Sequence, residues 1–276
     1  MTTLDVAQIT MNDGHVIPQL GFGTFKTPPA DTERAVAEAL AVGYRHIDTA
    51  KLYGNEHGVG AAIAASGLAR DEVFVTTKLW NDQHEPAQAR AGIEASLEQL
   101  GLDHVDLYLI HWPSTVLYGD AYVDAWDALQ DFQREGLATS IGVSNFNPEH
   151  LDKLNGQTPV VNQVELHPTF AQTGLRANMA ARRVVVEAWS PLGRGVDLDN
   201  QVISDIAAEV GATPAQVVIA WHLQSGIVVI PKSVTPARIA ENAGALDVTL
   251  SPDQMAAIDA LDCGNRIGGD PATADF

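Results

Sequence analysis

Eight short apolar runs, rich in β-branched residues, recur along this sequence, and a longer amphipathic stretch follows each one. Because a continuously apolar strand is buried on both faces, this alternation predicts a parallel sheet covered by helices. The runs are Gln19–Gly23, Arg45–Asp48, Val73–Thr77, Val105–Ile110, Thr139–Val143, Val160–Val164, Val184–Trp189 and Ile227–Ile230. The helical stretches are Asp31–Val42, Asn55–Ala65, Pro86–Leu100, Ala121–Glu135, Pro148–Leu154, Gly174–Arg182, Thr213–Gln224 and Pro236–Ala243.

Eight strand–helix units in 276 residues predict an α/β fold of the (β/α)8, or TIM-barrel, type. A doubly wound open sheet is the alternative. The turn after the first run, Gly21–Phe25, has two glycines but lacks the third glycine of a dinucleotide-binding loop. We therefore favour the barrel, and we expect residues 1–276 to form a single domain.

Three segments lie outside the strand–helix repeat. Val6–Met11 and His15–Ile17, joined by Asn12-Asp13-Gly14, predict an N-terminal β-hairpin. Asn200–Val210 predicts an extra helix after the seventh strand, and the helix start at Ser251 predicts another near the C-terminus.

The charge balance limits the partners of this chain. It has 16 Lys plus Arg and 35 Asp plus Glu, a formal net charge of −19, which disfavours binding to nucleic acid or to anionic membranes. The N-terminus has no signal-peptide pattern, no apolar run is long enough to span a membrane, and Cys263 is the only cysteine. We expect a cytoplasmic protein without disulfides.

Four polar residues follow neighbouring strands, at the end of a barrel where catalysis takes place. They are Asp48, Tyr53, Lys78 and His111. A Lys78–Asp48 pair beside Tyr53 is expected to lower the pKa of the phenol, so that it donates a proton to a developing alkoxide. His111 would hydrogen-bond the same oxygen and orient the carbonyl.

A proton donor beside a carbonyl still requires a reductant or a nucleophile. The serine-hydrolase, zinc-protease and P-loop motifs are absent from the sequence. Glu165 and His167 lie on one strand face, but two ligands are too few for a catalytic zinc site, so we expect no metal. Hydride transfer from a nicotinamide cofactor is the chemistry that remains.

The last quarter of the chain indicates where such a cofactor binds. Thr213 and Ser251 begin capping boxes with Gln216 and Gln254, whereas the helix after Thr235 has Arg238 at the same position. A cation in a first turn opposes the helix dipole, and Lys232 lies just upstream. Both cations follow the eighth strand, the usual phosphate site of a barrel, and Arg238 suits a ribose 2′-phosphate. This favours NADPH over NADH, while Trp189 offers a flat face to the nicotinamide.

These motifs together resemble the aldo-keto reductases over nearly the whole chain, and most of all the bacterial reductases of 2,5-diketo-D-gluconate and methylglyoxal. The resemblance rests on Gly43–Ala50, Tyr53, Glu56–Gly60, Thr76–Trp80, Ile110–Pro113, Ile141–Phe146 and Ile230–Ser233, with Arg238, Glu241 and Asn242. It implies an NADPH-dependent reductase of aldehydes and ketones, such as small α-dicarbonyls or keto-sugar acids.

The resemblance also implies roles for individual residues. Tyr53 would be the general acid/base, Lys78 and Asp48 would tune it, and His111 would orient the substrate. The residues implied to bind the cofactor are Thr24, Ser144, Asn145, Gln163, Trp189, Ser190, Pro191, Leu192, Lys232, Ser233, Val234, Arg238, Glu241 and Asn242. Of these, Ser144, Asn145 and Gln163 would hold the carboxamide.

Departures from the family pattern concern the substrate pocket. Phe25 stands where many members have Trp, and Trp189 where many have Tyr. Thr139, outside the tetrad, stands where the middle signature usually has a charged or amide side chain. The segment Ser114–Gly119 is brief, and the chain ends soon after the last predicted helix, so we expect no long C-terminal loop. Phe25, Trp80 and Trp112 are expected to line an aromatic pocket.

Two other functions are compatible with the sequence. One is a non-catalytic, NADPH-binding redox sensor on the same fold, and the other is a lyase or aldolase in which Lys78 forms a Schiff base. The Asp48 partner favours a charged, non-nucleophilic lysine, and no docking helix supports the sensor. On the resemblance, we expect a monomer acting on a small-molecule carbonyl substrate.

Overall fold

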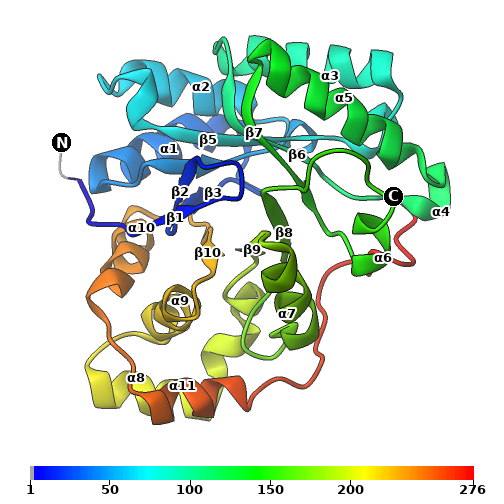
Figure 1. The fold of residues 1–276 in the computed structure, drawn as a ribbon. Helices are drawn as coiled ribbons and strands as arrows, with labels where there is room; N and C mark the ends of the chain where they lie inside the picture. The colour runs from blue at the N-terminus through cyan, green and yellow to red at the C-terminus, as the bar shows by residue number, and fades with distance from the viewer. Residues whose placement is uncertain (1–2) are drawn as a thin grey trace.

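The computed structural model describes residues 3–276 and contains a parallel sheet that closes on itself around a packed core (Figure 1). The sheet order is β10-β9-β8-β7-β6-β5-β4-β3. The strands are β3 (Phe22–Gly23), β4 (His46–Asp48), β5 (Phe74–Leu79), β6 (Val105–Ile110), β7 (Ala138–Ser144), β8 (Val161–Glu165), β9 (Val185–Trp189) and β10 (Val228–Val229). Each of the eight predicted runs supplies one strand, and the parallel pairing follows the chain order.

A parallel bridge between Leu20 and Val229 joins the two ends of this sheet. The backbone N–H of Gly21 donates to Val229 O at 2.9 Å, and that of Gly23 donates to Pro231 O at 3.2 Å. Only glycine fits here, because a Cβ at Gly23 would lie 2.9 Å from the carbonyl oxygen of Ile230. The closed barrel is therefore the architecture, and the first and last predicted strands shrink to two residues each at this short seam.

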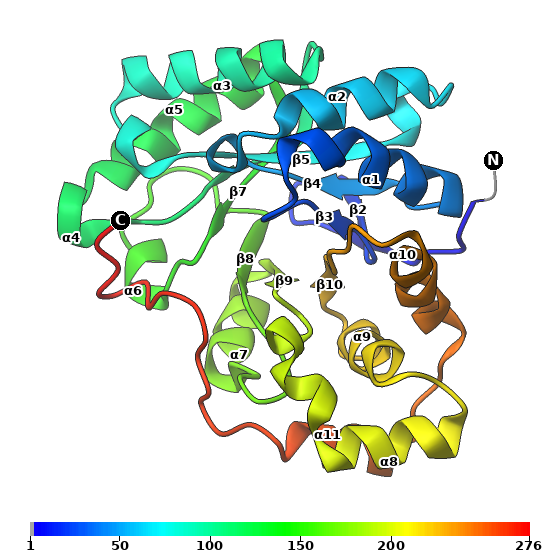
Figure 2. The same cartoon turned by 180° about the vertical axis from the view of Figure 1, so that it is seen from behind.

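Helices surround the barrel on the outside, as Figures 1 and 2 show from opposite sides. Their apolar faces pack on strands buried on both sides, which accounts for the continuous apolar runs. The helices are α1 (Pro29–Val42), α2 (Glu56–Ala65), α3 (Pro86–Leu100), α4 (Thr115–Tyr118), α5 (Ala121–Glu135), α6 (Pro148–Leu151), α7 (Thr173–Arg182), α8 (Gln201–Val210), α9 (Pro214–Gln224), α10 (Pro236–Ala243) and α11 (Pro252–Asp259). Short 3₁₀ helices are η1 (Lys51–Tyr53), η2 (Arg70–Glu72), η3 (Asn81–Gln83), η4 (Gly193–Asp199) and η5 (Gly244–Asp247).

The predicted hairpin forms from β1 (Gln8–Thr10) and β2 (Val16–Pro18), paired antiparallel. Gly14 has a φ of +91° at its turn, a conformation that glycine adopts without strain. Met11 and Ile17 of the hairpin pack with barrel residues such as Leu107 and Val161 in one apolar cluster. The hairpin thus closes the amino-terminal end of the barrel and leaves the carboxyl ends of the strands for a site.

The two helices expected outside the repeat are α8, after β9, and α11 near the C-terminus, and they lie side by side in both views (Figures 1 and 2). The capping boxes at Thr213 and Ser251 are confirmed, while Thr235 makes no side-chain cap at the start of α10. The brief segment Ser114–Gly119 is helical in part, since it holds α4.

Among residues 3–276, no single helix has the length and apolar character of a membrane span. Helices α8 and α9, which meet at 89°, have that length and apolar character only when they are taken together. Seven of the α9 residues are buried, so its apolar character is that of a core helix.

Candidate active site

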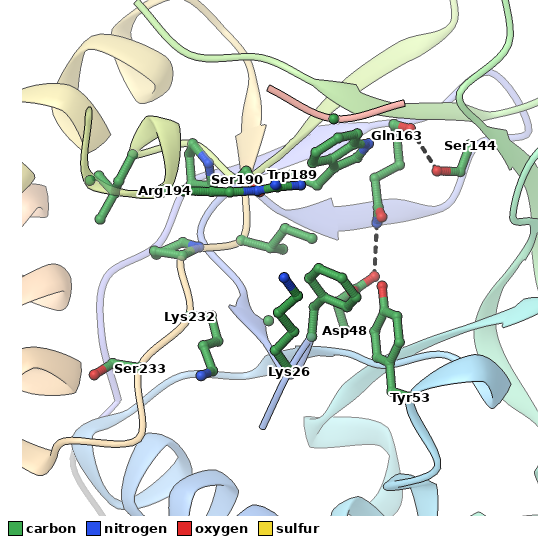
Figure 3. Close-up of a pocket in the computed structure, with 18 of the residues that line it drawn as sticks. Lys26, Asp48, Tyr53, Ser144, Gln163, Trp189, Ser190, Arg194, Lys232 and Ser233 are labelled. Atoms are coloured by element: carbon green, nitrogen blue, oxygen red, sulfur yellow. Dashed lines mark hydrogen bonds between the residues drawn. The ribbon is translucent and has the colours of Figure 1, made fainter. Parts of the chain in front are cut away.

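A cavity of about 1020 Å³ opens at the carboxyl ends of the barrel strands. Most of the predicted site residues line it, and they come from the strand ends and the loops that follow (Figure 3). Trp189, Ser190 and Arg194 lie along one side, with Lys26 and Lys232 across from them, while Asp48, Tyr53 and Gln163 lie at one end. The barrel therefore brings together residues that are far apart in the sequence.

Lys78 is the centre of the cluster at that end. It lies on β5 with no exposed surface, and its Nζ donates to Asp48 Oδ1 at 2.8 Å and Oδ2 at 2.7 Å. Two further bonds run from Nζ to Thr49 O at 2.9 Å and to Tyr53 Oη at 3.4 Å. Asp48 ends β4, next to β5, so parallel pairing places the carboxylate beside the ammonium. Tyr53, on η1, brings its hydroxyl to the same point from the loop after β4.

The ionisation of this cluster follows from burial and from the ion pair. Burial lowers the pKa of Lys78, but Asp48 and Tyr53 raise it, and the net pKa lies above its ordinary value. Burial raises the pKa of Tyr53 to about 12, although Lys78 acts in the opposite direction. The expectation that the Lys78–Asp48 pair lowers this pKa is therefore wrong for the net effect, because burial dominates and Asp48 also raises it.

His111 stands directly after β6, with its ring 5.7 Å from that of Tyr53 in an edge-on arrangement. Burial and the nearby charge of Lys78 hold its pKa well below the ordinary value, so the imidazole is neutral. Its Nδ1 has no hydrogen-bond partner among the described residues. A buried, unpaired ring nitrogen beside a protonated phenol is suited to binding a polar atom of a ligand.

The next group of predicted residues forms a hydrogen-bonded chain. Ser144 Oγ donates to Gln163 O at 2.7 Å, and Asn145 Nδ2 donates to His111 O and to Ser144 Oγ, both at 3.0 Å. Trp189 Nε1 donates to Asn145 Oδ1 at 2.8 Å, which fixes the indole at the cavity wall. Asn145 has a φ of +63°, a strained conformation for a residue other than glycine that the surrounding bonds hold in place.

Gln163 links this series of hydrogen bonds to the barrel interior. Its Nε2 donates to Asp48 Oδ2 at 2.8 Å and to Glu187 Oε2 at 3.0 Å. Figure 3 shows the first of these bonds crossing the end of the cavity. Both amide hydrogens are therefore committed, and only the oxygen of Gln163 is left to accept from a ligand.

The opposite end of the cavity is cationic. Arg194, Lys232 and Arg238 line it, in a chain whose formal net charge is −19. Burial lowers the pKa of Lys232, and Asp31 acts in the opposite direction. Arg238 lies in the first turn of α10, a helix of eight residues whose N-terminus has no side-chain cap. The cations, the uncapped helix and the cavity volume fit a dinucleotide with an anionic group at this end.

The sequence pattern of the aldo/keto reductase family matches residues 19–262. The chain belongs to this family.

Its relatives include the methylglyoxal reductase DkgA of Yersinia pestis, 52% identical over 270 residues and 95% of each chain. The methylglyoxal reductase DkgA of Escherichia coli (strain K12) is 49% identical over 269 residues, 95% of this chain and 96% of the relative. A crystal structure of a Gox0644 mutant in complex with NADPH matches with a TM-score of 0.94 and 45% identity, covering 98% and 99% of the two chains. The aldo/keto reductase from Brucella melitensis matches with a TM-score of 0.90 and 46% identity, covering 93% and 100%.

In this aldo/keto reductase, three of the predicted site residues do not line the cavity. Lys78 lies behind the cavity wall, where its Nζ bonds Asp48 and Tyr53. Thr24 is fully buried, and its hydroxyl donates to Asp48 O at 3.0 Å. The carbonyl of Val234 accepts from Arg34 Nη1 at 3.3 Å, outside the cavity lining. Thr24 and Val234, which are predicted to contact the cofactor, are not among the residues that line the cavity.

Thirteen further residues line the cavity that the sequence patterns do not single out. They are Gly23, Lys26, Leu52, Arg194, Gly195, Leu198, Pro214, Ala215, Ile230, Pro231, Gly268, Gly269 and Phe276. Lys26 and Arg194 have a recognisable sequence signal, because each is a cation in the loop after a predicted strand. The others reach the cavity only through the path of the folded chain.

The C-terminal segment is the clearest example of residues that reach the cavity through the path of the folded chain. It runs from α11 past α6 to α4 in both views (Figures 1 and 2). The carbonyl of Phe276 accepts from Asn81 Nδ2 at 2.7 Å and from Ser114 Oγ at 3.1 Å. Its ring stacks on Trp80 at 6.5 Å and packs edge-on against Trp112 at 5.1 Å. A short segment after the last helix therefore still supplies a wall of the cavity.

Three aromatic side chains form one wall of the cavity. Phe25, Trp80 and Trp112 all line the cavity near Tyr53 and His111. The Phe25 ring lies 5.1 Å from that of Tyr53, and the Trp80 ring lies 5.1 Å from that of His111. The space beside the Tyr53 hydroxyl is thus apolar on one side and hydrogen-bonding on the other.

Proposed function

We propose that this chain is an NADPH-dependent carbonyl reductase in which Tyr53 is the general acid/base. The observation that carries the proposal is the contact of Tyr53 Oη with the charged Lys78, 3.4 Å away at the end of a large cavity. The family membership and the NADPH complex of a similar protein support the same reaction and cofactor.

In this reaction, each residue of the cluster would have a separate role. Bound NADPH would supply a hydride to the carbonyl carbon. Because the pKa of Tyr53 is about 12, the phenol is protonated at neutral pH and able to donate to the carbonyl oxygen. Lys78, charged and held by both oxygens of Asp48, stabilises the phenolate left behind. Neutral His111 hydrogen-bonds the substrate oxygen and orients it.

The cavity suggests how the cofactor would lie. Trp189 would stack on the nicotinamide, and Ser144, Asn145 and the oxygen of Gln163 would hold its carboxamide. The Ser190–Leu192 segment would cover the pyrophosphate, with Ser233, Glu241 and Asn242 towards the adenosine. Lys232 and Arg238 would bind a ribose 2′-phosphate, which distinguishes NADPH from NADH.

The substrate is proposed to be a small, uncharged aldehyde or ketone. The wall formed by Phe25, Trp80 and Trp112 is aromatic, and relatives 49–52% identical are named methylglyoxal reductases. We therefore propose methylglyoxal and related α-dicarbonyls as the first substrates to test. A Schiff-base reaction at Lys78 has no support, because the amine is fully buried and paired.

The test is Tyr53→Phe, which removes only the hydroxyl. We expect kcat/KM for methylglyoxal to fall by about 100- to 10 000-fold, the range for loss of a general acid. NADPH binding, followed by quenching of tryptophan fluorescence, should change less than twofold, because Tyr53 lies at the substrate end. Activity equal to that of the wild type would refute the role of Tyr53.

A second test addresses the cofactor. Arg238→Ala should raise the Kd for NADPH by about 10- to 100-fold, as expected for loss of a charge-assisted hydrogen bond. The Kd for NADH should stay nearly constant, because NADH has no 2′-phosphate. An equal loss for both cofactors would place the 2′-phosphate elsewhere. That the enzyme is a cytoplasmic monomer stays a prediction, which size-exclusion chromatography and cell fractionation test.

A further inference from the structure

A buried cluster of three ionisable side chains lies behind the cavity and has no part in the proposed chemistry. His167 Nε2 is 3.2 Å from Glu165 Oε1, and His167 Nδ1 is 2.8 Å from Asp197 Oδ2. The side chains of all three residues have no exposed surface. The imidazole therefore lies between two carboxylates that come from different parts of the chain, the end of β8 and η4.

Glu165 connects this cluster to the C-terminal segment. Its carboxylate accepts from the backbone N–H of Ile267 at 2.6 Å and of Gly268 at 2.8 Å. Gly268 lines the cavity, and a Cβ there would lie 2.3 Å from Trp189 Cη2. The carboxylate thus holds the C-terminal backbone directly against the indole of Trp189, one of the walls of the cavity.

Asp197 connects the cluster to the loop after β9. It belongs to Gly193–Asp199, and three residues of that segment, Arg194, Gly195 and Leu198, line the cavity. The helix is interrupted, since Arg194 and Gly195 have φ of +52° and +98°. The helical bonding is therefore not continuous along the loop, and Asp197, which also accepts from Thr169 Oγ1 at 2.7 Å, is one of its attachments to the barrel.

The charges around His167 favour the imidazolium. Burial lowers the pKa of His167, but Asp197 and Glu165 raise it, to about 8 in total. His222 of α9 is neutral, its pKa lowered to about 4 by burial, with Arg176 of α7 and His167 itself acting in the same direction. Arg266 stacks on Phe170, whose ring is 6.1 Å from that of His167. At neutral pH one cation thus lies between two anions.

We propose that His167 is a positioning residue that, through Glu165 and Asp197, holds the Gly193–Asp199 loop and the Ile267–Gly268 backbone closed over the cofactor. The inference rests on the proposed binding of NADPH in this cavity. Without the imidazolium, two carboxylates remain buried near each other, and moving either of them towards water requires the loop or the C-terminal segment to move. The rate of cofactor release therefore depends on His167, which contacts neither cofactor nor substrate.

The first experiment compares the wild type with His167→Asn. We expect the NADPH dissociation rate, measured by stopped-flow fluorescence, to rise roughly tenfold, because changes in such contacts act mainly on release. KM for NADPH should rise in parallel, while kcat falls by less than twofold. His150→Asn is the control, since His150 is a buried histidine that bonds the backbone of Asn147 at α6, outside the cavity lining. That variant should release NADPH at the wild-type rate.

A second measurement needs no cofactor. Arg194 is exposed on the loop, so trypsin should cleave after it several-fold faster in His167→Asn than in the wild type. The pH dependence is a third measurement: as pH rises through about 8, NADPH release should accelerate more in the wild type than in the variant. Glu187, with a pKa also near 8, is present in both proteins and cannot produce a difference between them.

The outcomes separate the inference from the proposed function. A folded His167→Asn protein with wild-type NADPH release and wild-type cleavage after Arg194 would overturn the inference and leave the reductase proposal intact. If His167→Asn does not fold, Asp197→Asn tests the loop attachment alone. NADPH release at the wild-type rate in that variant would also overturn the inference. If the wild type binds no NADPH, yet trypsin cleaves the variant faster than the wild type, the attachment of the loop is supported and the proposed function is refuted.

Discussion

Lys78 keeps its charge inside the barrel because four acceptors surround its ammonium group: both oxygens of Asp48, the carbonyl of Thr49 and the hydroxyl of Tyr53. A buried ammonium with fewer partners would lose its proton instead. The position of Lys78 was predictable from its place at the end of an apolar run. The net pKa of Tyr53 was not, because the extent of burial depends on aromatic neighbours from other loops, such as Phe25.

A second carboxyl lies deeper in the barrel and has an unusual protonation state. Glu187 on β9 is fully buried, and burial together with Asp48 raises its pKa to about 8. Its Oε1 has no hydrogen-bond partner among the described residues, and His46, 3.6 Å away, is neutral because burial lowers its pKa to about 3. Glu187 is therefore protonated at pH 7, unlike an ordinary glutamate.

This state makes folding stability depend on pH. Between the ordinary value of 4.5 and about 8, the folded protein keeps a proton on Glu187 that the unfolded chain releases, so stability falls as pH rises. Glu187→Gln removes this loss, and we expect its free energy of unfolding to exceed that of the wild type by ~1 kcal/mol or more at pH 8. At pH 4.5 the two should be nearly equal.

Urea denaturation at pH 4.5, 6 and 8 checks this prediction, with Glu98→Gln, exposed on α3, as the control. The control should follow the wild type at every pH. Parallel pH profiles for Glu187→Gln and the wild type would show that Glu187 is ionised in the folded state.

At the scale of elements, α2 and α3 approach each other more closely than side chains normally permit. Gly60 of α2 lies against the backbone of Leu100 at the end of α3, and a Cβ on Gly60 would be 2.0 Å from the Leu100 carbonyl oxygen. Gly60→Ala must therefore separate the helices, and we expect it to lower the free energy of unfolding by about 1–3 kcal/mol.

Gly174→Ala is a matched control on another helix. Gly174 lies in α7, is exposed, and has nothing within 4 Å of the position of a Cβ. Alanine has the higher helix propensity, so this variant should gain up to about 1 kcal/mol. Thermal unfolding of the two variants measures the contrast. Equal stability of Gly60→Ala and Gly174→Ala would mean that α2 and α3 are not packed as described.

Most elements could be predicted from local patterns. The bounds of α3, α5 and α10 agree with those predicted, since proline starts two of them and apolar periodicity marks all three. The first and last strands, β3 and β10, are shorter than predicted, because the pairing of Leu20 with Val229 depends on closure of the barrel and not on local sequence. The C-terminal wall at Phe276 escaped prediction for the same reason, as its contacts with Asn81 and Ser114 span more than 160 residues.

At the scale of the whole molecule, cations are scarce and unevenly placed. Four of the 16 Lys and Arg residues, Lys26, Arg194, Lys232 and Arg238, line the cavity. The positive region needed for an anionic ligand was thus predictable at Lys232, just after the eighth strand, and at Arg238, in the first turn of the helix that follows. That residues 1–276 form one domain stays a prediction, which a single cooperative unfolding transition would support.

The uneven charge distribution leads to opposite effects of salt on stability and on cofactor binding. With a formal net charge of −19, acidic side chains repel one another across the surface, and NaCl screens this repulsion within about 10 Å at 0.1 M. Raising NaCl from 20 to 300 mM should therefore raise Tm by about 2–4 °C, the shift that ~1 kcal/mol produces in a chain of this size.

The same salt screens the cavity cations, so the Kd for NADPH should increase while that for NADH increases less. Thermal unfolding and fluorescence titration in the same buffers test both effects, with KCl as the control for ion identity. A Tm that falls together with NADPH affinity would mean that ion pairs such as Arg70–Asp106 stabilise the fold more than repulsion weakens it.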